Sequence, residues 1–369
     1  MRRILFFLSH QPNPRFIKQI NYLSNNSKIS VLFFQRESIR DLSNEYVHNC
    51  VLNKKIFTIK DGNYLNRVFR YIKSIKQALN EIFISDSSFV IVNNIDTLFF
   101  IILYKSIYRK DCNVTMQISD LREHTYRKNL KSRLLRRIEK SLFFHVDKLV
   151  VTSPKFYDLY YKNLFFNEVF VLENKPLGVF MPKFNKHNGN SKIKIGIVGQ
   201  LQQINPYITL LEQVKNSDQY EVHIHGMGPY TDVMKKYSFE YPNIFYHGSF
   251  NFFKDSAEIY SSLSMLYMPY DTTSDSLNNR VALPNKLYEA MFFQVPIITS
   301  SDTYLGSIVN DFGIGETLQC CKESEIIKTI ELVCSKKSSY KDIFKKIDKN
   351  FYLGDSDYIE YEKYISKII

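Results

Sequence analysis

Residues 266–315 read LYMPYDTTSDSLNNRVALPNKLYEAMFFQVPIITSSDTYLGSIVNDFGIG, and this stretch decides the fold. An apolar run ends at Pro269, and a polar loop follows it. A helix is predicted from Pro284, because proline suits the first helical position, where no backbone N–H is needed. A second apolar run, 296–299, ends in polar residues that can cap a further helix: Ser300, Ser301 and Asp302. Strand, helix and strand in this order predict a parallel sheet.

The same alternation extends in both directions along the chain. In the first half, strands are predicted at 4–8, 29–34, 89–92, 114–118, 148–152 and 170–172, with helices near 16–23, 64–83, 96–109 and 126–145. In the second half, strands are predicted at 194–198, 221–225, 244–246, 265–268 and 296–299, with helices near 206–216, 229–238, 254–263 and 284–293. The sequence therefore predicts an α/β protein with two Rossmann-like domains that face each other across a cleft.

A polar segment at 184–192 is predicted to link the two domains. The N-terminal domain is then 1–183, the C-terminal domain 193–354, and the tail 355–369 an amphipathic helix. Ligands of parallel sheets bind at the carboxyl ends of the strands, where helix N-termini present free N–H groups. We therefore expect an anionic ligand in the cleft.

Composition excludes several classes of protein. The chain has 369 residues, of which 44% are hydrophobic, so there is enough apolar material for a packed core and disorder is excluded as the main state. The five cysteines are odd in number and have no C-x-x-C spacing, which argues against a disulfide framework or a zinc site and favours a reducing cytoplasm. The longest apolar run, 98–104, is too short to cross a bilayer.

The charge is unevenly distributed. Residues 1–190 hold 31 Lys and Arg against 15 Asp and Glu, a net charge of +16. Residues 191–369 hold 18 against 22, a net charge of −4. A basic half favours an anionic partner, such as a phospholipid surface, a diphosphate-linked substrate or a nucleic acid. The alternative is a general lysine bias without functional meaning.

Lys286 and Glu289 lie three residues apart at the start of the helix predicted over 284–293, and so share one face. A cation and free amides at a helix start suit a diphosphate. A carboxylate one turn deeper suits the two hydroxyls of a ribose. The structural alternative is an exposed ion pair that contributes about 0.3–0.5 kcal/mol.

The segment PNKLYEAMFFQVPIITS, 284–300, resembles the donor-binding signature of GT-B glycosyltransferases, in particular the large retaining family four. Other segments resemble this family in the same order: GIVGQL at 196–201, HIHGMGP at 223–229 and YHGSF at 246–250. In the first half, VTSPKFYDLYY at 151–161 and VLENKP at 171–176 resemble the end of its acceptor domain. The resemblance covers most of the chain.

The resemblance implies transfer of a sugar, with retention, from a UDP- or GDP-linked donor, with no tightly bound cofactor and no required metal. It implies Arg280, Lys286 and Glu289 as catalytic residues, and a C-terminal helix that crosses back onto the first domain. The implied donor contacts are Gly199, Gln200, Gly226, Gly228, Phe250, Asn279, Pro284, Asn285, Leu287 and Ser301.

The sequence departs from the family pattern at three positions. The usual phosphate-binding Arg and Lys are replaced by Gln200 and Asn205, and a frequent second acid is replaced by Val281. These departures leave open a non-catalytic subunit that binds sugar nucleotide or polysaccharide. A nucleic-acid-binding protein and a sugar-nucleotide epimerase of the same fold also remain as alternatives, although no known nucleic-acid-binding motif accompanies the charge and no nucleic-acid partner is expected.

Polar residues that follow the first-half strands are candidates for binding the acceptor: His10 and Arg15 after 4–8, and Asp120 and His124 after 114–118. Each has a structural alternative, such as an ion pair within the domain or a hydrogen-bonded buried histidine. The acceptor implied by the resemblance is a saccharide or a lipid-diphosphate-linked saccharide of surface polysaccharide biosynthesis.

The run RKNLKSRLLRRIEK, 127–140, holds seven Lys and Arg and one acid, Glu139. Its apolar residues form a helical stripe: Leu130, Leu134, Leu135, Ile138 and Leu142. We expect the segment 127–145 to lie on an anionic membrane, which predicts a cytoplasmic protein held at the inner face of the cytoplasmic membrane. The alternative is an ordinary helix with a solvated polar face.

Overall fold

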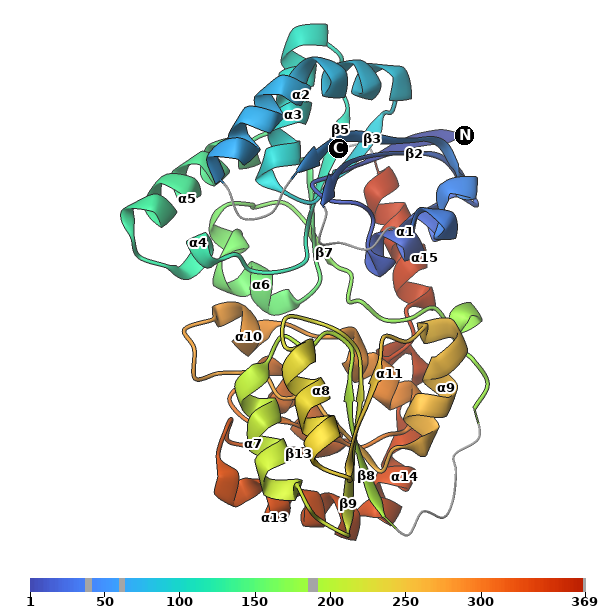
Figure 1. Cartoon of the computed structure of the whole chain (residues 1–369). Coiled ribbons are helices and arrows are strands. Elements are labelled where there is room, and N and C mark those ends of the chain that lie inside the picture. Colours follow the sequence, from blue (N-terminus) through green and yellow to red (C-terminus); the bar gives the residue numbers. More distant parts are fainter. Residues whose placement is uncertain (37–41, 60–63, 185–191, 368–369) are drawn as a thin grey trace. The chain divides into compact units, whose positions relative to one another are not determined.

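The computed structural model describes residues 1–36, 42–59, 64–184 and 192–367. The chain divides into two compact units (Figure 1). The first contains Met1–Glu173 together with Asp357–Ile369, and the second contains Asn174–Ser356. Each unit has its own parallel sheet flanked by helices, which confirms the prediction of an α/β protein with two Rossmann-like domains.

The first unit contains a seven-stranded sheet with the order β3-β2-β1-β4-β5-β6-β7. Its strands are β1 (Arg2–Leu8), β2 (Ser27–Arg36), β3 (Cys50–Ile59), β4 (Phe89–Val92), β5 (Asn113–Ile118), β6 (Lys148–Val151) and β7 (Val169–Val171). Its helices are α1 (Pro14–Leu23), α2 (Tyr64–Ser85), α3 (Ile95–Tyr108), α4 (Glu123–Tyr126), α5 (Leu130–Phe143), α6 (Pro154–Leu159) and the C-terminal α15 (Asp355–Ser366). Short 3₁₀ turns are η1 (Ser43–Glu45), η2 (Val47–Asn49) and η3 (Tyr161–Asn163).

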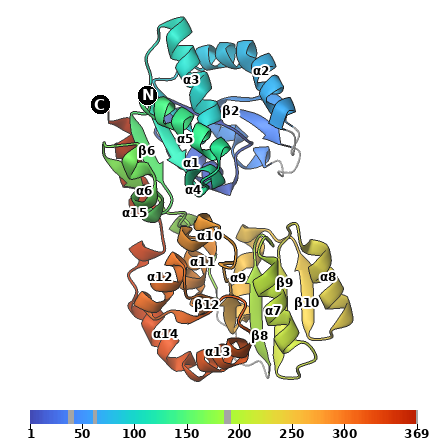
Figure 2. The same ribbon diagram turned by 90° about the vertical axis from the view of Figure 1, so that its left-hand side faces the viewer.

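The second unit contains a six-stranded sheet with the order β10-β9-β8-β11-β12-β13 (Figure 2). Its strands are β8 (Ile193–Val198), β9 (Tyr220–His225), β10 (Ile244–Gly248), β11 (Met265–Tyr267), β12 (Ile297–Ser300) and β13 (Gly315–Leu318). Its helices are α7 (Ile204–Val214), α8 (Thr231–Glu240), α9 (Phe252–Ser262), α10 (Leu277–Val281), α11 (Asn285–Phe293), α12 (Tyr304–Phe312), α13 (Glu323–Ser335) and α14 (Lys337–Lys346). Two 3₁₀ turns are η4 (Gly178–Phe180) and η5 (Lys349–Phe351).

The strand order reverses once in each sheet. β1 pairs with both β2 and β4, and β8 pairs with both β9 and β11. At such a reversal, the connections leave on opposite faces and open a crevice at the carboxyl ends of the strands. The two crevices therefore lie after β1 and β4 in the first unit, and after β8 and β11 in the second.

The sequence missed several elements at the sheet edges and in the tail of the second unit. Strand β3 contains the polar residues Asn53, Lys54 and Lys55, and strand β13 is the short segment GETL. Both are edge strands. An edge strand needs no apolar run, because one of its sides faces solvent. The helix predicted over 126–145 is interrupted, since α4 ends at Tyr126 and α5 begins at Leu130 with Asn129 as its cap. These differences change the element boundaries but leave the fold class intact.

Two predicted helix starts are corrected. α11 begins at Asn285, and Pro284 is its N-cap, in an extended conformation, rather than its first helical residue. α12 is capped by Thr303, whose hydroxyl accepts from the Gly306 N–H at 2.9 Å, rather than by the predicted Ser300, Ser301 or Asp302. Threonine forms the same cap as serine or aspartate, so the sequence alone did not separate neighbouring candidates.

The C-terminal helix belongs to the first unit. Tyr358 and Tyr361 of α15 are fully buried, and the Tyr364 hydroxyl donates to the Glu168 carbonyl at 2.6 Å. Lys148 of β6 donates to the Ile365 carbonyl at 2.9 Å. The predicted return of the tail to the first domain is therefore observed. Of the linker predicted at 184–192, residues 185–191 lie outside the described part of the chain, and the units divide earlier, after Glu173.

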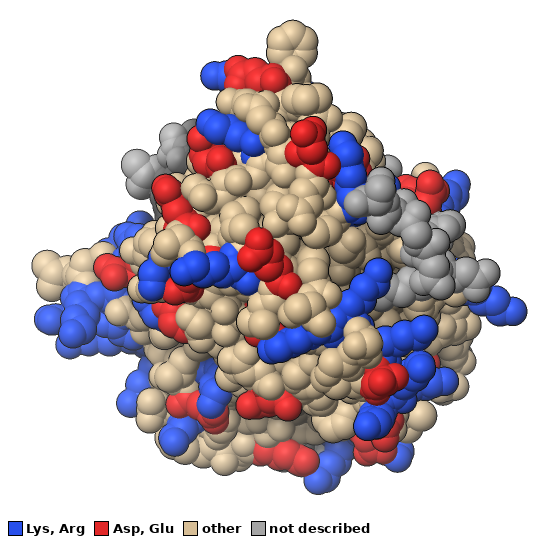
Figure 3. All heavy atoms as spheres, turned by 90° about the horizontal axis from the view of Figure 1, so that it is seen from below, with Lys and Arg blue, Asp and Glu red and all other residues tan. Residues whose placement is uncertain are grey.

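Seen from below, the molecule carries Lys and Arg side chains interspersed with Asp and Glu, so this face has no field of a single sign (Figure 3). Among the described helices, none is both long and apolar enough to cross a membrane.

Candidate functional site

The loops after β8 and β9 pack against each other beside the crevice of the second unit. Gly199 and Gly226 have φ angles of +99° and +150°, and a Cβ on Gly226 would lie 1.8 Å from the Gly199 carbonyl oxygen. A Cβ on Gly228 would lie 2.6 Å from the Leu201 carbonyl oxygen. The two loops therefore pack backbone against backbone, and this packing accounts for Gly226 and Gly228 without any ligand.

Lys286 lies beside Gly199. A Cβ on Gly199 would be 3.7 Å from the Lys286 Nζ, so the ammonium group occupies the carboxyl end of β8. Lys286 is in the first turn of α11, and burial lowers the pKa of its amine to about 8, with Glu289 opposing that shift. A strand end, a helix N-terminus and a cation thus converge, as the sequence predicts.

Glu289 lies one turn further along α11 and is held by Tyr260 of α9. The Tyr260 hydroxyl donates to the Glu289 Oε2 at 2.6 Å, and the Tyr260 ring stacks on Phe293 at 4.9 Å. Burial and the neighbouring carboxylate raise the pKa of Tyr260 well above its usual value, so the phenol keeps its proton and remains a donor. Tyr260 is not identifiable from the sequence, because nothing in the local pattern of α9 links it to α11.

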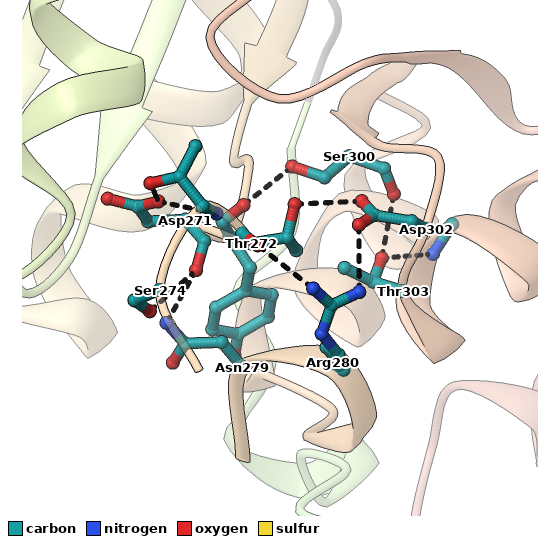
Figure 4. Close-up of polar contacts among 11 residues, drawn as sticks. Asp271, Thr272, Ser274, Asn279, Arg280, Ser300, Asp302 and Thr303 are labelled. Carbon is teal, nitrogen blue, oxygen red and sulfur yellow. Dashed lines mark hydrogen bonds and ion pairs between the residues drawn. The ribbon is translucent and has the colours of Figure 1, made fainter. Parts of the chain in front are cut away.

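Arg280 of α10 is held by a loop network (Figure 4). Its guanidinium group bonds to the Asp302 carboxylate at 3.0 Å and donates to the Thr272 carbonyl at 3.0 Å. Asp302 also accepts from the Thr272 hydroxyl at 2.9 Å. Arg280 is therefore positioned by the loop between β11 and α10, and its charge is balanced by Asp302. A role for Arg280 with phosphate remains a prediction that requires this pair to open.

The remaining predicted donor contacts fall in different environments. Asn279 donates to the Asp271 carbonyl at 2.9 Å, and Gln200 accepts from Gln202 at 2.8 Å. Leu287 is buried in the hydrophobic core of the second unit, and Phe250 packs partly against the same core. Asn285 bonds to Asn174, and Ser301 is exposed after β12. The structure thus brings Gly199, Lys286 and Glu289 together. The side chain of Leu287 is in the core, so only the backbone of Leu287 can contact a ligand.

The position of the missing family lysine, Asn205, has a structural role. Its amide donates to the Asp271 carboxylate at 2.9 Å, which ties the start of α7 to the loop after β11. A neutral amide here leaves Lys286 and Arg280 as the cations of the predicted donor site.

The first unit has its own polar cavity of about 180 Å³ at the carboxyl ends of β1, β4 and β5. Three of the four predicted acceptor residues line it, namely His10, Arg15 and Asp120. The Arg15 Nε is buried without a hydrogen-bond partner, and burial lowers the pKa of Arg15 while Asp120 opposes the shift. The Asn93 side-chain amide donates to the His10 Nε2 at 3.2 Å, and burial lowers the pKa of His10.

His124 does not line this cavity. It is buried, and its Nε2 lies 3.1 Å from the Glu139 Oε2, while Tyr160 donates to the same oxygen at 2.5 Å. Glu139 itself lines the cavity, so His124 acts on the cavity through Glu139 rather than directly. The structural alternative for this histidine, a hydrogen-bonded buried residue, is the arrangement found.

Arg122 and Asn93 also line the cavity, and the sequence analysis did not single them out as acceptor residues. The sequence held a signal for both, since Asn93 directly follows the buried strand β4 and Arg122 lies in the loop after the buried strand β5. With two arginines, Arg15 and Arg122, and two carboxylates, Asp120 and Glu139, among its lining residues, the cavity can hold an anionic group or several sugar hydroxyls.

Comparison with known proteins bears on the fold and on the class of protein. Residues 192–328 match a family model described as Glycosyl transferases group 1. The whole chain resembles several solved structures. The lipopolysaccharide outer core galactosyltransferase WaaB, in its apo form, is 14% identical with a TM-score of 0.66 over 99% of both chains. Anabaena HepE in complex with UDP is 10% identical with a TM-score of 0.68 over 100% of both chains.

Sucrose-phosphate synthase from Thermosynechococcus elongatus is 11% identical with a TM-score of 0.69 over 99% of this chain and 98% of that one. No curated protein matches the sequence. At these identities the structural likenesses show the fold, which is the predicted GT-B fold. The match over 192–328 supports a glycosyltransferase domain in this part of the chain.

Proposed function

We propose that this chain is a retaining glycosyltransferase that moves a sugar from a nucleotide-diphosphate donor to a saccharide or a lipid-diphosphate-linked saccharide. The observation that carries the proposal is the Lys286 ammonium group beside Gly199, in the first turn of α11, with Glu289 one turn deeper. HepE binds UDP and UDP-glucose, which supports a UDP-linked donor for this chain as well.

In the proposed reaction, the bond between the sugar C1 and the diphosphate oxygen breaks, and the acceptor oxygen forms the new bond to C1 on the same face. The acceptor proton passes to an oxygen of the departing diphosphate, so no separate base is needed. Lys286 and the free N–H groups of α11 stabilise the charge that develops on the diphosphate. Arg280 adds a second cation when it leaves Asp302, and Glu289, fixed by Tyr260, binds the ribose hydroxyls.

The acceptor is proposed to bind the first unit. The cavity of His10, Arg15 and Asp120 supports an acceptor with an anionic group, because the buried Arg15 Nε has a hydrogen bond to offer. A phosphate or diphosphate of a lipid-linked saccharide can accept this hydrogen bond and pair with the charge of Arg15. A neutral sugar does not pair with that charge. The galactosyltransferase WaaB, named for the lipopolysaccharide outer core, supports a place in surface polysaccharide biosynthesis.

Membrane contact is proposed through α5. Its apolar residues Leu130, Leu134 and Ile138 are 80%, 60% and 43% exposed, while the polar Ser132 and Glu139 are buried. The apolar stripe thus faces outward, with exposed basic residues beside it at Arg133, Arg137 and Lys140. An amphipathic helix with this arrangement suits the headgroup region of an anionic membrane. This supports a peripheral protein at the inner face of the cytoplasmic membrane.

The proposal is tested by incubating the purified chain with a panel of UDP- and GDP-sugars and following release of the free nucleoside diphosphate. Release with one donor, lost in both Lys286→Ala and Glu289→Ala but kept in Lys236→Ala on the exposed surface of α8, supports an enzyme. Tight donor binding without release or transfer, with or without acceptor, would leave the non-catalytic subunit as the answer.

A further inference from the structure

Three histidines gather at the edge of the second sheet, outside the pair formed by Lys286 and Glu289. His223 and His225 come from β9, and His247 comes from the edge strand β10. Along β9 the residues alternate, with Tyr220, Val222 and Ile224 buried and the histidines between them only partly buried. Both histidines of β9 therefore point to the same face of the sheet.

A shift in strand pairing brings His247 to the same face. The register between β10 and β9 changes between Tyr246 and Gly248, so His247 lies at an irregularity of the ladder. Such bulges redirect a side chain relative to its neighbours. As a result the His247 ring stacks against both others, 4.2 Å from His225 and 5.3 Å from His223 between ring centres.

The nitrogen atoms are spaced as metal ligands are. One nitrogen from each of the three rings lies within 4.8 Å of the other two, and the His223 Nδ1 is 3.1 Å from the His247 Nε2. Two nitrogens bound to one zinc ion at about 2.0–2.1 Å each, in tetrahedral geometry, are about 3.3 Å apart. The nearest pair matches this spacing, but the His247 ring is stacked nearly parallel to the other two, at 5° and 8°. Because imidazole lone pairs lie in the plane of the ring, metal binding requires the exposed His247 to rotate out of this stack so that its nitrogen points at the same ion.

A carboxylate completes the arrangement. The His223 Nε2 lies 3.3 Å from the Glu221 Oε2, on the side of the ring opposite to His247. A metal-bound histidine usually donates its other ring N–H to a carboxylate, which fixes the ring and directs the free lone pair at the metal. Glu221 is placed to accept this bond from His223, which leaves the His223 Nδ1 facing His247.

We propose that His223, His225 and His247 form a binding site for one divalent transition-metal ion of the zinc type, with water as the fourth ligand. Three imidazoles suit Zn²⁺ and its late first-row neighbours rather than Mg²⁺ or Ca²⁺, which prefer oxygen. The site joins the edge strand β10 to β9 within one unit. It does not depend on the proposed function, because it uses none of the residues that bind donor or acceptor.

The surrounding charges permit this role. Lys194 adds a repulsive charge near His223 and His247, and Asp255 adds an attractive one near His225. The two charges act in opposite directions on an incoming cation.

The test is calorimetric titration of the full chain, stripped with a chelator, with ZnCl₂. We expect one equivalent to bind and to raise the melting temperature, because the ion binds only the folded strands. His223→Ala, His225→Ala and His247→Ala should each weaken binding at least tenfold, and Glu221→Gln should weaken it about 10- to 100-fold. His145→Ala, an exposed histidine in the first unit, is the matched control and should bind like the wild type.

A second group of residues, Asp271, Cys320 and Cys321, also has ligand atoms within 4.8 Å of one another. The experiment must therefore distinguish zinc binding at this group from zinc binding at the histidines. Zinc binding that persists in the double variant His223→Ala/His247→Ala, or that disappears in Cys320→Ser/Cys321→Ser instead, overturns the proposal. Absence of stoichiometric binding to the wild type overturns it as well. Cooperative unfolding and unchanged UDP binding in each variant show that the fold is retained.

Discussion

At the scale of single residues, the amine of Lys286 has a pKa lowered to about 8 by burial in the second unit. A diphosphate binds the protonated amine, so below about pH 8 the free protein is already in the binding form. Above that pH, a proton must be taken up on binding, and the affinity for UDP should fall by up to tenfold for each further pH unit. Calorimetry between pH 7 and 9.5 measures this fall.

The Lys286→Met variant serves as the control for this pH profile. It should bind UDP weakly at every pH and show no change around pH 8. A wild-type affinity that stays constant from pH 7 to 9.5 would contradict the assignment of Lys286 to the diphosphate.

Gly226 is the second residue whose chemistry has a measurable consequence. Gly226→Ala brings a methyl group into contact with the Gly199 carbonyl, where it would lie 1.8 Å away, whereas Gly248→Ala has open space around the new Cβ. Both glycines have positive φ, which costs an alanine about 1–2 kcal/mol. Gly226→Ala should lose a further ~1–3 kcal/mol in the free energy of unfolding, because of the overlap. Equal losses in urea unfolding would refute the close contact.

At the scale of secondary-structure elements, α5 is notable because its apolar stripe is exposed. The double variant Leu130→Ser/Leu134→Ser should reduce binding to vesicles rich in phosphatidylglycerol at least tenfold, because each leucine contributes about 1.5–3 kcal/mol when fully buried in an apolar medium. Phe239→Ser on α8 is the matched control, since Phe239 is 92% exposed but lies in the second unit.

Wild-type binding should also weaken in 0.5 M salt and be slight on vesicles of phosphatidylcholine, because part of the attraction is electrostatic. Co-sedimentation measures all of these. If the leucine variant binds anionic vesicles as tightly as the wild type, α5 is not the contact.

Helix α15 is fixed to the first unit by its aromatic residues. Tyr361 is fully buried there, while Ile359 on the same helix is 51% exposed. Tyr361→Ala should lower the free energy of unfolding by about 3 kcal/mol or more, as large-to-small changes of buried aromatic residues do. Ile359→Ala should change it by less than ~1 kcal/mol. Chemical denaturation followed by circular dichroism compares the two, and similar losses would argue against docking of α15.

At the scale of the whole molecule, the alternation of apolar runs and helical patterns was sufficient to predict two Rossmann-like units. The central strands β1 and β8 are mostly apolar and end in buried stretches, ILFFL and IGIV, so they were visible in the sequence. β3 and β13 were not, because edge strands tolerate lysine, asparagine and glutamate. Helix boundaries near Pro284 and Thr303 differed by a residue or two, since several adjacent residues are able to cap a helix.

Some residues of the candidate site could also be predicted from the sequence, and others could not. Lys286, Glu289 and Gly199 carry a local pattern, and the fold brings them together. Tyr260, Arg122 and the ion pair of Arg280 with Asp302 depend on contacts between distant segments, which no local pattern contains. His124 was selected for its position after β5, but the buried Glu139 that faces it was visible only in three dimensions.

The central claim is that the first turn of α11, through Lys286, holds the diphosphate of a sugar nucleotide. Its most direct test is calorimetric titration of UDP at pH 7 into the wild type, Lys286→Met and the control Lys236→Met. The account predicts one UDP site, weakened roughly 10- to 100-fold in Lys286→Met, since a hydrogen bond to a charged group contributes about 1.5–3 kcal/mol, and unchanged in Lys236→Met. Equal UDP affinity in Lys286→Met and the wild type would contradict it.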